Sequence, residues 1–309
     1  MRCADFDRCL LANRDFLAIV GDSRPMIPQI TRFAPSPTGR LHLGHAYSAL
    51  VAWDLARKNG GELLLRIEDI DTTRCRPEFI EGIYEDLAWL GLSWPEPVRV
   101  QSEHLEDYQS ALSELERGDL IYPCFCTRKE IQLEIARAGA APHGPEGALY
   151  PGLCRRLSLD EREAKKSAGT DFALRLDVEK AQQLLGTDLT WTDQIQGEIR
   201  AEPESLGDVV LARKDIGTSY HLAVTVDDAM QGVTLVSRGE DLFHTTHIHR
   251  LLQALLELPV PLYHHHKLLK GEDGKRFAKR DLSQTLKSMR EAGVSPDEIR
   301  ERCGFNNVA

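Results

Sequence analysis

Residues 32–45 read RFAPSPTGRLHLGH, and this stretch decides the fold. It starts in a short apolar strand candidate at 30–34 and passes through a loop rich in proline and glycine at 35–39. It then enters a helix candidate at 44–58. The free N–H groups and the dipole of a helix N-terminus attract phosphate. A strand, a rigid loop and a helix N-terminus therefore predict an α/β domain with an anion site at this turn.

Two imidazoles stand at the start of the expected helix. His42 and His45 can donate hydrogen bonds to phosphate oxygens as charge builds up in a transition state. Gly44 between them lets the backbone come close to a purine or a ribose. A simple helix cap is the alternative, but the eight preceding motif residues favour function.

Strand and helix candidates alternate outward from this motif. An apolar run of strand length occupies 62–67, and Pro77 opens a helix with apolar residues at helical spacing. Strands are expected again at 209–212 and 233–236, with a helix at 246–258. This order favours an α/β fold with a parallel sheet.

The chain divides into five expected segments. They are an N-terminal extension (1–29), the first half of the α/β domain (30–118), an insertion (119–200), the second half (201–265), and a loop with a short helical stub (266–309). The extension is either an appended tail or precedes a natural start at Met26, and its order is left open. The 29 residues after Arg280 fall below the roughly 40 that an independent domain needs.

Composition excludes several classes of protein. Lys and Arg total 38 against 48 Asp and Glu, so the net charge of −10 excludes a uniformly basic nucleic-acid coat but not a local basic groove. No apolar run approaches the ~18 residues of a membrane span. The seven cysteines are scattered, unlike those of a secreted miniprotein. We expect a cytoplasmic protein without a membrane partner.

The stretch at 32–45 resembles the first motif of class I aminoacyl-tRNA synthetases, in the form that glutamyl- and glutaminyl-tRNA synthetases use. The resemblance covers most of residues 30–285 and implies a Rossmann-type catalytic domain that activates an amino acid with ATP and Mg²⁺. His42 and His45 would be catalytic and, with Gly44, bind ATP. The residues that the resemblance places in the amino-acid pocket are Arg32, Phe33, Ala34, Pro35 and Ser36.

Three further pocket residues follow from the same resemblance. Glu68 follows the second strand candidate, where α/β sheets place ligand groups, and would meet the substrate α-ammonium. Tyr220 and Arg238 would hold the carboxylates of glutamate, the arginine by a bidentate fork. The alternatives are a solvated loop acid, a core tyrosine and a surface arginine. The remaining histidines are expected on helix surfaces or packed inside rather than on a metal; they are His244, His247, His249 and the run 264–266.

The second motif of the family is a Lys-Met-Ser-Lys-Ser loop, and residues 276–280 match it as RFAKR. Lys279 keeps the second lysine, which would neutralise the triphosphate as a catalytic and ATP-binding residue. Ala278 replaces the serine, which bears on the efficiency of activation more than on its occurrence. A basic surface loop is the alternative.

The cysteines at 124, 126 and 154 form the other group with chemistry. Cys124-Phe125-Cys126 places two thiols on one turn, and Cys154 adds a third, whereas a closed tetrahedral site needs four ligands. His143 is one choice for the fourth. The pattern Cys-x-Cys…Tyr-x-x-x-Cys of the glutamyl-Q tRNA(Asp) synthetase family implies Tyr150 instead, and one structural zinc. Buried free cysteines are the alternative.

Resemblance to that family, together with the absence of a C-terminal anticodon-binding domain, implies a reaction in two steps. Glutamate and ATP would give glutamyl-adenylate without tRNA. The glutamyl group would then pass to queuosine at the first anticodon position of tRNA(Asp). The expected partners are ATP, L-glutamate and queuosine-bearing tRNA(Asp), with the protein a monomer. The alternatives are a truncated glutamyl-tRNA synthetase that charges a tRNA 3′ end, and a non-catalytic paralogue that binds nucleotide or tRNA.

Overall fold

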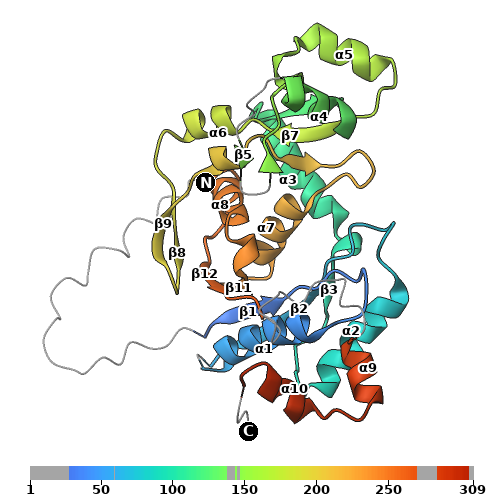
Figure 1. The fold of residues 1–309 in the computed structure, drawn as a ribbon. Helices are drawn as coiled ribbons and strands as arrows, with labels where there is room; N and C mark the ends of the chain where they lie inside the picture. Colours follow the sequence, from blue (N-terminus) through green and yellow to red (C-terminus); the bar gives the residue numbers. More distant parts are fainter. Residues whose placement is uncertain (1–27, 59, 138–142, 145–146, 270–283, 306–309) are drawn as a thin grey trace, which may run out of the picture.

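The computed structural model describes residues 28–58, 60–137, 143–144, 147–269 and 284–305 (Figure 1). Residues 1–27 of the expected N-terminal extension lie outside this part. The described chain has parallel strands in its lower half as drawn, and a separate antiparallel sheet near the top.

The first half of the α/β domain contains three parallel strands in the order β1-β2-β3. Its core forms because the apolar positions of α1 and β2 face each other, and Ala46, Leu50 and Ile67 are fully buried there. The strands and helices expected in this half are confirmed. The elements are β1 (Ile30–Phe33), α1 (Leu43–Lys58), β2 (Glu62–Ile67), α2 (Pro77–Trp89) and β3 (Arg99–Val100).

The second half continues the same run of strands. The backbone N–H of Thr234 donates to the carbonyl of Ile30 over 2.9 Å, which sets β11 beside β1, and β11 pairs in parallel with β12. β1 therefore lies between β2 and β11. The elements are α7 (Tyr220–Met230), β11 (Leu235–Gly239), α8 (Thr245–Leu255) and β12 (Leu262–His266).

A hairpin from the range expected as the insertion joins this sheet. β8 (Thr190–Asp193) pairs in parallel with β12, with Asp193 opposite Tyr263, and β9 (Gly197–Arg200) pairs antiparallel to β8. The hairpin thus places Asp193 next to the second half of the domain.

The antiparallel sheet has the order β10-β7-β4. The strand expected at 209–212 is present as β10, and it pairs with β7 of the expected insertion. The elements in and around this sheet are α3 (Leu105–Arg117), β4 (Ile121–Cys124), α4 (Arg128–Arg137), β5 (His143–Gly144), β6 (Gly147–Ala148), α5 (Leu159–Ser167), β7 (Ala173–Leu176), α6 (Val178–Leu185) and β10 (Val210–Ala212).

Two short helices, α9 (Leu286–Glu291) and α10 (Pro296–Arg302), form the expected stub. Leu286 and Ile299 are fully buried in the core that α1 and α2 share, so these helices pack against the first half (Figure 1). Among the described residues, no helix combines the length and apolarity that crossing a membrane requires.

Candidate active site and metal centre

The two histidines of the first motif lie together at the N-terminus of α1, with 3.8 Å between their ring centroids. The backbone N–H of Gly44 donates to Nδ1 of His42 over 3.1 Å, and that of His42 donates to Nδ1 of His45 over 3.2 Å. A nitrogen that accepts a hydrogen bond carries no proton, so each ring is neutral and bears its proton on Nε2. Both rings therefore have a donor nitrogen of the kind that a phosphate oxygen accepts from.

The second motif lies outside the described residues, including Lys279. The chain that follows it, however, returns to the first motif. Thr285 forms an isolated antiparallel bridge with His42, and the N–H of Leu286 donates to the carbonyl of Leu41 over 2.8 Å. Residue 285 is five positions after Arg280, so the chain beyond the second motif is anchored beside the histidines.

The carboxyl ends of β1, β2 and β11 meet at one edge of the sheet, where α/β proteins bind ligands. Phe33 and Pro35 are buried there, Ala34 is half-buried and Ser36 is exposed. The N–H of Glu68 donates to the carbonyl of Pro35 over 3.1 Å. The pocket loop after β1 is thus fixed to the acid after β2.

Arg32 and Arg66 converge on Asp228, an acid of α7. Nε of Arg32 and Nη1 of Arg66 donate to its Oδ1 over 3.1 Å and 2.8 Å. Arg32 also donates from Nη1 to the carbonyl of Ser237 over 2.9 Å. Both arginines are buried and form an ion pair with the carboxylate of Asp228, which anchors the guanidinium of Arg32 to α7.

Glu68 belongs to the same charge network. Nη2 of Arg66 donates to its Oε1 over 3.3 Å, and its side chain is 12% exposed. Burial raises the pKa of Glu68 to about 7, against the opposing effect of Arg66 and Arg32. Its carboxyl group therefore gains or loses a proton near neutral pH.

Arg238 has a different environment, at the end of β11 and 5% exposed. Its hydrogen bonds go to four neutral groups: Nε to His265 Nε2 (3.1 Å), Nη1 to the Tyr220 hydroxyl (3.3 Å) and to His249 Nδ1 (3.3 Å), and Nη2 to Thr246 Oγ1 (2.6 Å). Among the described residues no carboxylate lies within ion-pair distance of it. Burial raises the pKa of Tyr220, and the nearby charges of Arg238, Glu68 and Arg32 also act on this hydroxyl group.

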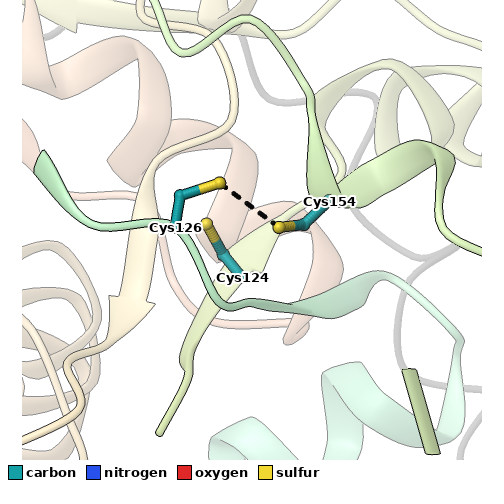
Figure 2. A group of neighbouring side chains, drawn as sticks. All are labelled: Cys124, Cys126 and Cys154. Atoms are coloured by element: carbon teal, nitrogen blue, oxygen red, sulfur yellow. Dashed lines mark hydrogen bonds between the residues drawn. The ribbon is translucent and has the colours of Figure 1, made fainter. Parts of the chain in front are cut away.

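The three cysteines of the second group also come together, and Figure 2 shows their sulfur atoms converging. Their Sγ atoms lie within 4.8 Å of one another, and Cys126 Sγ is 3.4 Å from Cys154 Sγ. Cys124 comes from the end of β4, and Cys154 starts a short 3₁₀ turn at Cys154–Arg156. This is the spacing of thiols that could share one metal ion.

Tyr150 closes the group. Its hydroxyl oxygen is 3.4 Å from Cys124 Sγ and 3.6 Å from Cys126 Sγ, and it accepts the backbone N–H of Cys154 over 2.9 Å. Tetrahedral zinc with Zn–S bonds of about 2.3 Å separates its sulfurs by about 3.8 Å, so this donor set fits such a metal. The side chain of His143, the other choice for a fourth ligand, lies outside the described part.

Comparison with known proteins identifies the family. The model for class I tRNA synthetases (E and Q), catalytic domain, matches residues 29–305. The chain belongs to this family. It is an aminoacyl-tRNA synthetase-like ligase, as the resemblance in residues 32–45 predicts.

Several relatives in the family are similar over most of the chain. A glutamyl-Q tRNA(Asp) synthetase of Rhodobacter capsulatus is 50% identical over 280 residues, which cover 89% of this chain and 100% of the relative. One from Symbiobacterium thermophilum is 45% identical, covering 87% and 83%. A glutamate–tRNA ligase of Aquifex aeolicus is 39% identical, covering 87% of this chain and 55% of its own length.

Solved structures in the family share the fold. A glutamate tRNA ligase from Elizabethkingia meningosepticum, in complex with its amino acid, matches with a TM-score of 0.67 and 29% identity. The match covers 82% of this chain and 52% of that one, so this chain spans about half the length of the solved ligase.

The family motifs did not reveal the residues that hold the site arginines. These residues are Asp228, which accepts from Arg32, and His249 and His265, which accept from Arg238. A signal existed for the first of these, because Asp227-Asp228 is an acidic pair inside an otherwise apolar helix. His247, His249, His265 and His266 are buried, as expected of packed histidines, and His244 is exposed.

Proposed function

We propose that this protein activates glutamate with ATP to form glutamyl-adenylate, and then transfers the glutamyl group to queuosine at the first anticodon position of tRNA(Asp). The observation that carries the first step is the buried guanidinium of Arg238, whose described partners are all neutral. Activation is expected to proceed without tRNA.

The charges around the pocket suit an acidic amino acid. An isolated buried charge is costly unless a partner of opposite sign reaches it, and Arg238 has none among the described residues, whereas Arg32 and Arg66 do. A carboxylate of glutamate would supply the missing negative partner of Arg238 through charge-assisted hydrogen bonds. Glu68, once ionised, would hold the α-ammonium. One site thus offers a cation and an anion to a ligand that carries both signs.

The chemistry of activation requires little more than orientation and charge stabilisation. An oxygen of the substrate α-carboxylate attacks the α-phosphorus of ATP, and the bond to the leaving pyrophosphate breaks. The Nε2–H groups of His42 and His45 would donate to phosphate oxygens as their charge grows, and Lys279 would neutralise the triphosphate. The Mg²⁺ that accompanies ATP would share the charge of pyrophosphate.

The acceptor is proposed from the relatives. The Rhodobacter capsulatus glutamyl-Q relative is matched along its whole length at 50% identity, whereas the Aquifex aeolicus ligase is 39% identical and matched over 55% of its length. A hydroxyl of queuosine would attack the acyl carbonyl of the adenylate and release AMP. Because the net charge is −10, the RNA phosphates would contact local basic residues, and binding should weaken steeply with salt.

We propose zinc as the metal of the cysteine group, with Cys124, Cys126, Tyr150 and Cys154 as ligands. Three thiolates and a phenolate oxygen are donors that zinc accepts in a closed structural site. The metal would join the end of β4 to the turn at 154–156 and take no part in the reaction.

Glutamate-dependent exchange of pyrophosphate into ATP, with and without tRNA, tests activation. Exchange that appears only with tRNA would indicate an ordinary glutamyl-tRNA synthetase, and no exchange at all a nucleotide- or tRNA-binding paralogue. Transfer is tested with labelled glutamate and tRNA(Asp) with or without queuosine, followed by nuclease fragmentation. Label on the anticodon fragment, only when queuosine is present, supports the proposal. Label on the 3′ adenosine or on tRNA(Glu) contradicts it.

A further inference from the structure

The hydrogen bonds around Arg238 fix the protonation of its neighbours. A guanidinium can only donate, so Nε2 of His265, 3.1 Å from Arg238 Nε, must be an acceptor without a proton. The proton of His265 is then on Nδ1, which lies 2.8 Å from Oδ2 of Asp193 and donates to it. His265 is a neutral ring in one tautomer, with its donor side on Asp193 and its acceptor side on Arg238.

The turn after β8 fixes the orientation of the Asp193 carboxylate. Its Oδ1 accepts the N–H groups of Ile195 (2.8 Å) and Gln196 (2.9 Å), and its Oδ2 also accepts the backbone N–H of His265 (3.1 Å). Burial opposes ionisation, but these hydrogen bonds lower the pKa of Asp193. The carboxylate is therefore charged. Its Oδ1 accepts from the two turn N–H groups, and its Oδ2 is the oxygen that accepts from the ring of His265.

His249 repeats the arrangement from α8. Its Nδ1 accepts from Arg238 Nη1 over 3.3 Å, so Nε2 carries the proton and lies 3.3 Å from Nδ1 of His221. Burial, and then the charge of Arg238, lower the pKa of His265 and of His221 to about 4, and that of His249 falls as well. All three rings are neutral at pH 7.

We propose that Asp193, His265 and His249 are positioning residues for Arg238, which they orient by neutral acceptors so that its positive charge stays available to a carboxylate of the substrate. This inference rests on the proposed function. A carboxylate in place of either imidazole would orient the guanidinium equally well, but it would neutralise the arginine and compete with the ligand. The structure uses such carboxylates at Arg66, which Asp228 and Glu68 contact directly.

The first test is Asp193→Asn. The asparagine side chain has two orientations. Its NH₂ group faces either Nδ1–H of His265 or the N–H groups of Ile195 and Gln196, so in each orientation two hydrogen-bond donors face each other. When it faces His265, the proton moves to Nε2 and Arg238 loses that acceptor, as in triads whose orienting aspartate is replaced. We expect the KM for glutamate to rise about tenfold or more, with the KM for ATP unchanged. Asp188→Asn is the matched control, because Asp188 is exposed just before the same strand and pairs with Arg200.

The second test is a pair of variants at His249, which keeps the inference falsifiable if Asp193→Asn does not fold. His249→Asn retains an acceptor oxygen where Nδ1 lies, whereas His249→Leu removes it. The KM for glutamate should stay within about threefold of the parent in the asparagine variant and rise about tenfold in the leucine variant. A merely structural role would lower kcat or melting temperature and leave the KM for glutamate alone.

The tautomers are measured separately by ¹⁵N NMR of the imidazoles in the substrate-free protein. A proton on Nδ1 of His265 and on Nε2 of His249 supports the inference, and the reverse overturns it whatever the activity. An active parent enzyme with an unchanged KM for glutamate in Asp193→Asn and His249→Leu overturns the inference alone. A parent with the expected tautomers but no glutamate-dependent exchange overturns the proposed function, and the inference with it.

Discussion

The ring of His42 packs against Gly44, where the Cβ of any other residue would lie 3.0 Å from Cε1 and 3.2 Å from Nδ1 of that ring. A side chain at position 44 would therefore displace the ring of His42 by a few tenths of an ångström, so glycine supports the placement of the motif's own histidine in addition to any approach of ATP. Gly44→Ala should displace the ring and lower the rate of pyrophosphate exchange by about 10²-fold, the usual cost of one lost transition-state donor.

The same Gly44→Ala variant should be more stable to unfolding than the parent, although it is less active. Gly44 lies in the first turn of α1, and alanine in a helix is favoured over glycine by about 0.5–1 kcal/mol. Gly39→Ala is the control, because no atom of the described residues lies within 4 Å of its added Cβ. Exchange kinetics and thermal unfolding of both variants measure the effect. Full activity in Gly44→Ala would show that the position of His42 is not critical.

The pH dependence of glutamate use should reflect Glu68. Because burial raises its pKa to about 7, the carboxyl group of the free enzyme is increasingly protonated below that pH and cannot hold the substrate ammonium group. The value of kcat/KM for glutamate should therefore fall as pH decreases through about 7. Glu68→Gln should abolish this dependence and lower kcat/KM at pH 8 by about tenfold or more. Glu62→Gln, at the exposed start of β2, should change neither quantity.

Local pattern accounts for what the sequence predicts well. The motif at 32–45, the apolar run at 62–67 and the helix from Pro77 each depend on neighbours in the chain, and all appear as expected. The pairing of β8 with β12 does not depend on neighbours in the chain, because Asp193 and His265, which it brings together, are 72 residues apart. The support of Arg238 by Asp193 through His265 could not be predicted for that reason, although the family resemblance indicates Arg238 and its acceptor Tyr220.

A buried acid between α2 and α9 should make stability depend on pH. Asp86 is fully buried, and Arg290 Nη1 is 3.6 Å away. Within the described part of the chain, neither of its carboxylate oxygens has a hydrogen-bond partner. Burial raises its pKa to about 6, against the pull of Arg290 and Arg40. The folded protein thus binds this proton more tightly than the unfolded chain, so the contribution to stability is present below about pH 4 and is lost as pH rises through about 6.

Asp86→Asn should remove this dependence. The free energy of unfolding at pH 8 should rise on the order of 1 kcal/mol relative to the parent, with a smaller difference at pH 5. Urea unfolding at several pH values gives the difference curve. Glu85→Gln is the control, since Glu85 is exposed and contacts the same Arg290. A parallel pair of pH curves for Asp86→Asn and the parent would refute the assignment.

The metal proposal predicts one zinc per chain by elemental analysis and its loss in Cys154→Ser. A metal-bound thiol must lose its proton, and burial raises the pKa of the Cys126 thiol to about 12 in the metal-free chain. Metal binding therefore displaces protons, and retention against a chelator should fall steeply between pH 8 and pH 5. Cys75→Ser is the control, because Cys75 is a free cysteine outside the cluster and should leave the zinc content unchanged.

Tyr150→Phe separates a ligand from a nearby side chain. The phenylalanine keeps the ring under Arg175, whose Cζ lies 3.9 Å from the ring centroid. It removes the oxygen that faces Cys124 and Cys126 and that also accepts the backbone N–H of Cys154. If that oxygen is the fourth ligand, the variant should bind zinc but release it to a chelator about tenfold or more faster. The melting temperature should fall more in the metal-bound form than in the metal-free form, which loses only the hydrogen bond from the backbone N–H of Cys154. Equal release rates in Tyr150→Phe and the parent would assign the fourth position to another donor. A parent that is stable and active without any metal would refute the site as a whole.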